Sequence, residues 1–257
     1  MDLEDVRLDM EGEVARITIC RSHKRNAMRN QTADELLSAL RTAESGGARA
    51  ILLTGEGQAF GAGYDLATLD PGVVPDLDHV LETHFNPLIR AMRASPLPIV
   101  SAVGGACAGA SVGVALAADI VIAGRSAFFY EPFVGIALVP DAGNTLFLPR
   151  MAGRIRAAGA MLLGDRIPAA EAERWGLVWK LVDDDQLLPE AEAICGRLAE
   201  RPASALAMTK RLINHASERD LGAMLDLERD LQGEAGRGPE MRAAVDRFFA
   251  ARKGAVQ

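Results

Sequence analysis

Four short stretches of the chain are apolar at almost every position, instead of at every second position. They read VARITIC, ARAILLTG, LPIVSAVGG and ADIVIAG, and they begin at Val14, Ala48, Leu97 and Ala118. Strands that are apolar on both faces are typical of parallel sheets covered by helices on both sides. Because helical patterns separate the four stretches, the sequence predicts an α/β fold with mostly parallel strand pairing.

Helical spacing of apolar residues is clearest in two segments between these strands. NQTADELLSALRTAESGG, residues 30–47, opens with polar capping residues, carries an apolar face and ends in two glycines. Residues 76–93 repeat the pattern. Further along, Trp175 and Trp179 lie four positions apart, a spacing that predicts a ridge of core side chains under another helix.

No strand pattern follows Pro189, and the rest of the chain predicts three amphipathic helices. They read PASALAMTKRLINHAS, LGAMLDLERDLQGEAG and PEMRAAVDRFFAARK. The last helix carries an apolar stripe made of Met241, Ala244, Val245, Phe248 and Phe249. That stripe needs a partner surface, either the chain's own core or a neighbouring subunit. We therefore expect a core of residues 1–195 and a helical region of residues 196–257.

Composition narrows the classes of protein to which the chain can belong. Its 257 residues are 49% hydrophobic and 25% charged, which is typical of a soluble domain with a large core. A net charge of -7 without a basic cluster argues against a nucleic-acid partner. Three widely spaced cysteines predict free thiols in a reducing compartment. No segment suits a signal peptide or a membrane span and no histidine spacing suits a metal, so we expect a cytoplasmic protein without membrane or metal.

Two stretches rich in Gly and Ala stand where strands end. The first is FGAGYDL, residues 60–66, and the second is AVGGACAGASVGVALAAD, residues 102–119, which runs into a helical pattern. Free backbone N–H groups at such a helix start can hold an anion or a developing oxyanion. Small residues also allow a helix to pack tightly against its strand, and the stretch alone leaves both interpretations open. Neither stretch fits a dinucleotide or P-loop motif.

These two stretches, together with RSHKRNA at residues 21–27, resemble the signatures of the enoyl-CoA hydratase/isomerase (crotonase) superfamily, in order and over essentially the whole chain. The resemblance implies a spiral of ββα turns and a C-terminal helical region that makes a homotrimer or a dimer of trimers. It implies an acyl-CoA thioester as substrate and no cofactor, since coenzyme A is part of that substrate. It also implies that the backbone N–H groups of Tyr64 and Ala110 form an oxyanion hole.

The acid and base residues depart from the hydratase pattern. The positions that match the two glutamates of family hydratases are Gly113 and Phe133, while Glu131 lies two positions from the second and is expected to be structural. Asp141, in VPDAGN, would by itself be a turn or N-cap aspartate. By resemblance it matches the carboxylate that family isomerases use as a single acid and base. Its apolar neighbours, among them Val139, are expected to raise its pKa.

The resemblance implies a set of substrate-binding residues in the loops around this site. They are Lys24, Arg25, Ala27, Ala62, Gly63, Asp65, Leu66, Gly109, Phe133 and Leu138. Further segments, LDLERDLQGEAGR among them, are similar to a branch of the family in aerobic phenylacetate degradation, whose members open a ring epoxide of phenylacetyl-CoA and shift double bonds in enoyl-CoAs. That branch typically has Gly at the position of Ser111 and Asn at that of Gly113, so the acyl pocket is expected to differ.

Three functions follow as hypotheses. The first is an isomerase of acyl-CoA enolates that works through Asp141. The second is another crotonase-type catalyst, a hydratase or thioester hydrolase, that recruits Glu131. The third is a non-catalytic acyl-CoA-binding protein in which the oxyanion hole persists and Asp141 is only a turn residue. Exchange of the α-proton with solvent separates the third from the others, and hydration of a 2-enoyl-CoA separates the second from the first.

Overall fold

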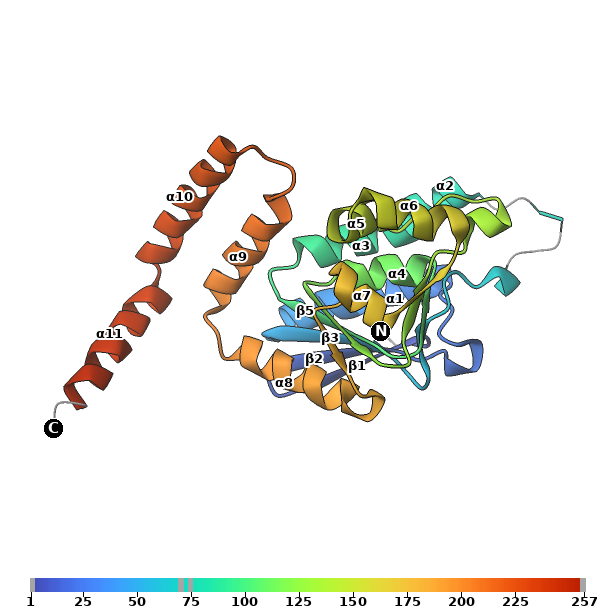
Figure 1. Ribbon diagram of the computed structural model, residues 1–257. Coiled ribbons are helices and arrows are strands. Elements are labelled where there is room, and N and C mark those ends of the chain that lie inside the picture. Colours follow the sequence, from blue (N-terminus) through green and yellow to red (C-terminus); the bar gives the residue numbers. More distant parts are fainter. Residues whose placement is uncertain (1–2, 69–71, 74–75, 255–257) are drawn as a thin grey trace. The chain divides into compact units, whose positions relative to one another are not determined.

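The computed structural model describes residues 3–68, 72–73 and 76–254, and it divides into two compact units, Met1–Ala199 and Glu200–Gln257 (Figure 1). Helix α8, Leu187–Ala199, runs across residue 195, where the core was expected to end. It belongs wholly to the first unit, because its apolar side chains pack on the strands of that unit.

The first unit contains a six-stranded sheet in the order β1-β2-β3-β5-β7-β10. Its strands are β1 (Val6–Glu11), β2 (Val14–Ile19), β3 (Ala50–Gly55), β5 (Ile99–Val103), β7 (Ile120–Gly124) and β10 (Lys180–Val182). β1 is antiparallel to β2, and all other neighbours are parallel. The predicted parallel sheet is confirmed. The apolar pattern did not predict β1, since only one residue of this edge strand is buried.

A second, four-stranded sheet stands beside the first, in the order β4-β6-β8-β9. Its strands are β4 (Ala59–Gly61), β6 (Ala106–Ala108), β8 (Phe128–Tyr130) and β9 (Arg166–Pro168). Along the chain β3, β5 and β7 each lead into a strand of this sheet and then into helical structure. The expected spiral of ββα turns is therefore confirmed. Strands of three residues are too short to leave a periodic pattern in the sequence.

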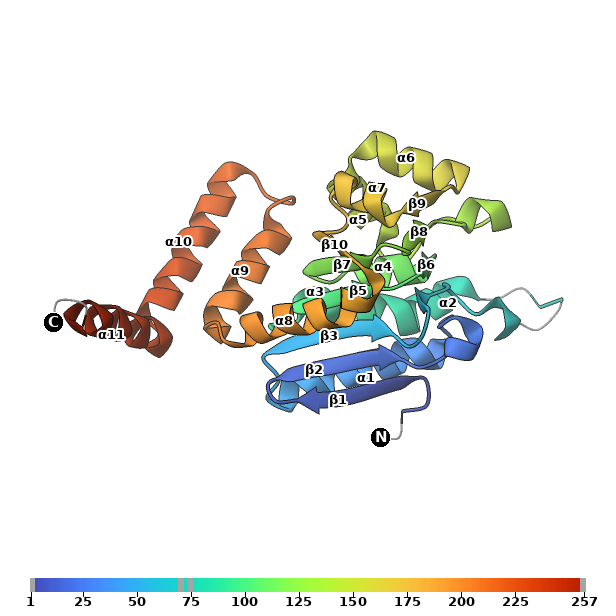
Figure 2. The same cartoon turned by 60° about the horizontal axis from the view of Figure 1, so that its bottom comes forward.

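Helices cover both faces of the larger sheet, as the continuous apolar strands predicted. The helices of the first unit are α1 (Asn30–Ser45), α2 (Leu77–Val80), α3 (Asn86–Ala94), α4 (Ala110–Leu116), α5 (Asn144–Ala152), α6 (Arg154–Leu163), α7 (Ala169–Trp175) and α8. A π-helical turn, Leu81–Phe85, joins α2 to α3 within the helix predicted at residues 76–93. Figure 2 shows α8 in front of the larger sheet and α1 behind it.

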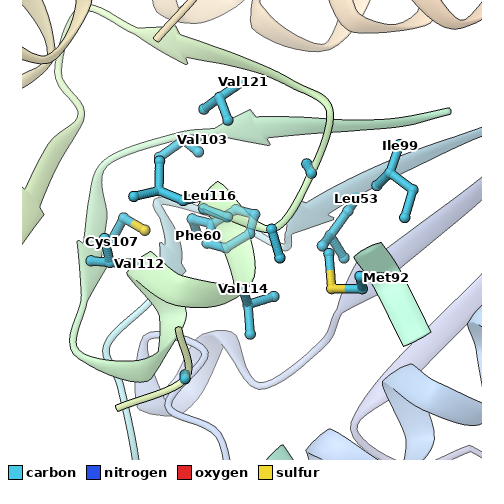
Figure 3. Packing of buried hydrophobic residues seen from close by; sticks show 14 of the residues in the cluster. Leu53, Phe60, Met92, Ile99, Val103, Cys107, Val112, Val114, Leu116 and Val121 are labelled. Atoms are coloured by element: carbon cyan, nitrogen blue, oxygen red, sulfur yellow. The ribbon is translucent and has the colours of Figure 1, made fainter. Parts of the chain in front are cut away.

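The strand β3 illustrates the two-sided core. Ile51 and Leu53 pack in the larger apolar cluster with residues of α1, α3 and α4, whereas Ala50 and Leu52 pack with α8. In the larger cluster the side chain of Phe60, which is fully buried, lies among apolar residues of β6 and α4 (Figure 3). This packing anchors the first Gly-rich loop, which begins immediately after Phe60, to the helix that follows the second one.

The ridge predicted for Trp175 and Trp179 is wrong. Helix α7 ends at Trp175, and the next residue, Gly176, has a φ of 85° that terminates the helix. Trp179 lies beyond this end, where its backbone N–H donates a hydrogen bond to the Val121 carbonyl. Trp179 is 61% exposed. A glycine in the left-handed conformation between the two residues thus overrides their helical spacing.

The second unit consists of α9 (Ala203–His215), α10 (Leu221–Arg237) and α11 (Pro239–Gly254), as the sequence predicted. The carboxylate of Glu240 accepts a hydrogen bond from the Ala203 backbone, which ties α11 to the start of α9. The apolar stripe of α11 stays open: its four large side chains, from Met241 to Phe249, are between 36% and 57% exposed. In the described part of the chain, no helix is both long and apolar enough to cross a membrane.

Candidate active site

The backbone N–H groups of Tyr64 and Ala110 are free to receive a ligand. Tyr64 lies in the loop after β4, and Ala110 is the first residue of α4, where an N–H has no partner within the helix. Neither group donates a hydrogen bond to any other residue that the structure describes. Around Tyr64, the neighbouring polar groups are occupied, since Met28 exchanges backbone hydrogen bonds with Gly63 and Asp65.

Two glycines bring the segments that carry these donors into contact. Gly63 has a φ of 90°, and a Cβ there would lie 3.1 Å from the Ala108 carbonyl oxygen. Gly109 has a φ of 54°, and a Cβ there would lie 3.5 Å from the Gly63 Cα. Both positions need the conformational range of glycine, and both allow one backbone to approach the other. The Gly-rich composition of the two loops therefore serves their mutual approach, which places the two donors on adjoining loops.

The side chain of Tyr64 anchors its loop. The ring stacks edge-on against Phe85 with the ring centres 5.9 Å apart, and the hydroxyl donates to the Asn30 side chain at 3.1 Å. Phe85 ends the π-helical turn, so this irregular turn supports the loop. The tyrosine side chain holds the loop while its backbone N–H remains available.

Asp141 lies on a turn that is fastened to the second donor segment. The backbone N–H of Asn144 closes the turn by donating to the Asp141 carbonyl at 2.9 Å. The side-chain amide of Asn144 donates to the Gly109 carbonyl at 3.1 Å. Asn144 is fully buried, and the sequence motifs did not single it out. A buried polar residue at the start of an apolar helix is the signal that could have found it.

Burial raises the pKa of Asp141 to about 6, while a hydrogen bond from its own backbone lowers it. One of its carboxyl oxygens is buried without a partner among the described residues. The raised pKa agrees with the sequence-based expectation; of the apolar residues that precede Asp141, Phe133 is 6% exposed and Val139 is 78% exposed.

The space that a hydratase-type glutamate would occupy is taken by the Asp141 turn. A Cβ on Gly113 would lie 2.1 Å from the carbonyl oxygen of Ala142, which follows Asp141. No side chain larger than glycine fits there without moving the turn. At the second hydratase position, Phe133 is 6% exposed, and its ring lies 3.8 Å from the Cβ position of Gly109. An apolar ring thus borders the loop that leads into Ala110, at the position that the sequence resemblance matches to a hydratase glutamate.

Glu131 follows β8 and is only 1% exposed, and neither of its carboxyl oxygens has a hydrogen-bond partner among the described residues. Burial raises its pKa to about 8, and the charge of Asp141 acts in the same direction. No hydrogen bond among the described residues therefore supports the structural role that the sequence predicted for the Glu131 carboxyl. At neutral pH the Glu131 carboxyl is neutral and Asp141 carries the charge of the pair.

The predicted coenzyme A loop is exposed. Lys24 and Arg25 lie on a short 3-10 turn at the surface, and Leu66 is 51% exposed. Ala62 and Leu138 are half-buried. Ala62 and Leu66 lie two residues from Tyr64 in the chain. The contacts of all five residues with a substrate stay a prediction.

Asp65 and Ala27 hold the loop from inside. The buried guanidinium of Arg21 pairs with Asp65 at 2.9 Å and with Asp5 at 3.4 Å, and it donates to the Ala27 carbonyl. Asp5 in turn is bonded by Arg29. The Asp65 carboxylate is paired with Arg21, and this pair holds the loop in place. The predicted contact of Asp65 with a substrate stays a prediction.

A separate open cleft of about 1320 Å³ lies at the other end of the smaller sheet. It is bordered by Gln58, Gly105 and Phe128, at the starts of β4, β6 and β8, whereas Tyr64 and Ala110 follow the ends of β4 and β6. Of the predicted substrate-binding residues only Arg25 borders it. Among the described residues no group of His, Cys, Asp or Glu side chains is arranged to hold a metal ion.

The spiral of ββα turns, with free amides after two strands of its smaller sheet, defines a protein of the crotonase fold. Residues 9–255 match the family described as enoyl-CoA hydratase/isomerase, and the chain belongs to this family.

The relatives of this chain include a protein named as an isomerase and a protein named as a hydratase. The chain is 40% identical over 254 residues to the 1,2-epoxyphenylacetyl-CoA isomerase of Escherichia coli (strain K12), which covers 97% of both chains. It is also 40% identical over 250 residues to the "Probable enoyl-CoA hydratase" of Rhodobacter capsulatus, which covers 97% of this chain and 96% of the relative. A structure from Thermobifida fusca YX in complex with CoA superimposes with a TM-score of 0.83 at 32% identity, over 90% of this chain and 92% of the other.

Proposed function

We propose that the protein is an isomerase of acyl-CoA thioesters that moves a proton between carbons of the acyl group through a single carboxylate, Asp141. The observation that carries this proposal is the half-buried Asp141 with a pKa of about 6, on a turn bonded to the oxyanion segment. A carboxylate with this pKa is ionised at neutral pH and is a stronger base than an exposed one.

The reaction begins when the thioester carbonyl accepts hydrogen bonds from the N–H groups of Tyr64 and Ala110. Asp141 then removes a proton from the α-carbon, and the electron pair moves into the carbonyl to give an enolate that the two donors stabilise. Each donor of this kind is worth about 3–4 kcal/mol in comparable sites. For a 3-enoyl thioester, neutral Asp141 returns the proton to the γ-carbon and gives the conjugated 2-enoyl product. One carboxyl suffices because the proton taken equals the proton returned.

The proposed substrates are 2-(1,2-epoxy-1,2-dihydrophenyl)acetyl-CoA, 3-enoyl-CoAs, or both. The first follows the name of the Escherichia coli relative. The second needs only the proton shift described above. Coenzyme A is part of both substrates, so the reaction as proposed uses no cofactor. We propose that Lys24 and Arg25, which are both exposed, bind the coenzyme A phosphates as charged donors.

Hydration is the less favoured alternative. It requires an activated water and a proton donor together, yet the two hydratase positions hold Gly113 and Phe133. Glu131 would have to act as the missing base, but its pKa of about 8 keeps it neutral at neutral pH. A binding protein without catalysis gives no reason for a carboxyl oxygen of Asp141 that is buried without a partner among the described residues, because such a group costs stability.

The decisive experiment is conversion of a 3-enoyl-CoA to the 2-enoyl-CoA by the wild type and by Asp141→Asn. We expect wild-type turnover, loss of turnover in the variant, and retained binding of coenzyme A esters by both. Equal activity of the variant would exclude Asp141 as the base. Water addition to a 2-enoyl-CoA would favour the hydratase, and a wild type without α-proton exchange would favour the binding protein.

We also propose a homotrimer or a dimer of trimers and a cytoplasmic location. The open stripe on α11, whose members include Phe248 and Phe249 at 57% and 56% exposure, supports the assembly. Sedimentation of the full chain tests it, and substitution of both phenylalanines by serine is expected to dissociate the oligomer.

A further inference from the structure

The two donors of the oxyanion hole belong to segments that are 46 residues apart in the chain, counted from Tyr64 to Ala110. A thioester oxygen receives both hydrogen bonds only if the two segments are held in register. The paired strands β4 and β6 align the two segments as far as Gly61 and Cys107, and glycine contacts let the loops beyond them approach. These glycine contacts are not directional, so a directional bond between the loops would hold the two donors in register.

Ser111 supplies such a bond. It follows the donor residue Ala110 in α4, its side chain is fully buried, and its hydroxyl oxygen accepts a hydrogen bond from the Gly63 N–H at 3.1 Å. Gly63 directly precedes Tyr64, the other donor residue. One hydroxyl thus joins the residue after one donor to the residue before the other.

The space around this hydroxyl is fitted to it. A Cβ on Gly61 would lie 2.3 Å from the Ser111 hydroxyl oxygen and 2.9 Å from its Cβ. A side chain at position 61 and the serine hydroxyl at position 111 therefore exclude each other. The two positions form a matched pair, in which Gly61 leaves the room that the Ser111 side chain fills.

We propose that Ser111 is a positioning residue of the oxyanion hole, whose hydroxyl holds the Gly63 N–H, and with it the loop that carries Tyr64, in register with the N–H of Ala110. The inference rests on the proposed function, because it assigns Ser111 to the oxyanion site of the isomerase. Ser111 does not touch the substrate in this role. Loss of its hydroxyl leaves the buried Gly63 N–H without an acceptor, so the loop shifts to find another one and carries the Tyr64 N–H with it.

The first test is kinetic and uses Ser111→Ala with Ser101→Ala as the matched control. Ser101 is likewise a fully buried serine, but its hydroxyl has no hydrogen-bond partner among the described residues. For Ser111→Ala we expect kcat for 3-enoyl-CoA isomerisation to fall about 10- to 100-fold with KM within about twofold, since misplaced groups cost rates of this size. Equal losses in both serine variants would overturn the proposal, because they would reflect general destabilisation.

The second test reads the oxyanion hole without turnover. Acetoacetyl-CoA ionises to an enolate with a distinct ultraviolet absorbance, and donors at its thioester oxygen lower the pH at which the bound form ionises. We expect the wild type and Ser101→Ala to lower this pH equally, and Ser111→Ala to retain an effect about tenfold weaker in ionisation constant. An undiminished effect in Ser111→Ala would overturn the proposal, as would a wild type without any effect.

The third test uses the matched pair. Gly61→Ala is expected to abolish most activity in the native background, where the new methyl strikes the Ser111 hydroxyl, and to cause a smaller loss in Ser111→Gly, where the Asn26 carbonyl at 3.2 Å is the remaining close contact. Equal effects in both backgrounds would contradict the proposed fit. A wild type that shifts the ionisation of acetoacetyl-CoA but does not isomerise 3-enoyl-CoA would refute the proposed function. In that case the comparison of Ser111→Ala with the wild type in the acetoacetyl-CoA experiment decides the role of Ser111.

Discussion

Two buried carboxyl groups lie near one another, Asp141 on its turn and Glu131 directly after β8, but they differ in the size of their pKa shifts. Both groups are covered by protein, and both have carboxyl oxygens without partners among the described residues. The pKa of Asp141 rises only to about 6, whereas that of Glu131 rises to about 8. Burial alone therefore does not make a general base, because a group buried too deeply keeps its proton.

The difference has a local cause. Asp141 is half-buried on a turn whose backbone donates a hydrogen bond to its carboxylate, and this bond favours the charged form. Glu131 is 1% exposed and receives no such bond from the described residues, and ionised Asp141 opposes its ionisation. The pair thus holds one negative charge at neutral pH, and the turn keeps that charge on Asp141.

The largest effect is expected from Asp141→Asn, which removes the charged member of the pair. General acid and base groups contribute about 10²- to 10⁴-fold, so kcat for 3-enoyl-CoA isomerisation should fall by at least a factor of about 100. Steady-state kinetics on a 3-enoyl-CoA measures it. In the wild type the rate should rise as pH increases through about 6, where Asp141 ionises, and a residual variant rate that kept this limb would contradict the assignment.

A second substitution moves the Asp141 turn without touching either carboxyl. Gly113→Ala places a methyl against the Ala142 carbonyl, and we expect it to lower the free energy of unfolding by about 1–3 kcal/mol and to reduce isomerisation. Gly159→Ala in α6 is the control, because nothing lies within 4 Å of its Cβ position. Thermal unfolding and turnover of both variants measure the contrast. A Gly113→Ala protein with native stability and activity would show that the turn is not fixed by α4.

A third variant, Glu131→Gln, tests the neutral member through stability. Since the pKa of Glu131 is raised from 4.5 to about 8, its favourable contribution is complete below about pH 4.5 and is lost as pH rises toward 8. A tenfold change in an ionisation constant corresponds to about 1.4 kcal/mol, so Glu131→Gln should gain a few kcal/mol over wild type as pH rises across this range. Urea unfolding of both proteins at several pH values measures the difference, and parallel curves would disprove the raised pKa.

The smallest effect concerns the alkaline side of the rate profile. When Glu131 ionises near pH 8, a second negative charge forms near Asp141, and we expect it to disfavour the negative charge of the proposed enolate. We expect a decline of a few-fold in wild-type isomerisation above that pH and a flat profile in Glu131→Gln. Initial rates measured from neutral pH to well above the pKa of Glu131 compare the two proteins. A decline shared by both would assign the alkaline limb to another group.

The features that depend on local pattern were predictable from the sequence. Continuous apolar runs predicted the parallel sheet, and helical spacing predicted α1 and the three C-terminal helices. The strands β4, β6 and β8 were missed because three residues carry no period, and the helical ridge at Trp175 was mispredicted because Gly176 ends the helix. Such features depend on single backbone conformations, which composition does not reveal.

The site was only partly predictable for a similar reason. Motifs pointed to the Gly-rich loops and to Asp141, but the bonds that hold these parts together join residues far apart in the chain. Gly63 and Ser111 are 48 residues apart, and Gly109 and Asn144 are 35 apart. A sequence pattern shows each partner alone, without a sign that the two meet, so pairs of this kind become visible only in three dimensions.

The buried guanidinium of Arg21 has a consequence for local unfolding. It connects the Asp65 end of the oxyanion loop to Asp5, immediately before β1, and β1 is an edge strand that pairs only with β2. Edge strands open at lower free energy than central ones. Fraying of β1 would therefore remove one of the two carboxylates that hold the Arg21 guanidinium and would loosen one of the bonds of the loop while the rest of the sheet remains folded. Amide hydrogen exchange in β1 and around Gly63 should then rise and fall together.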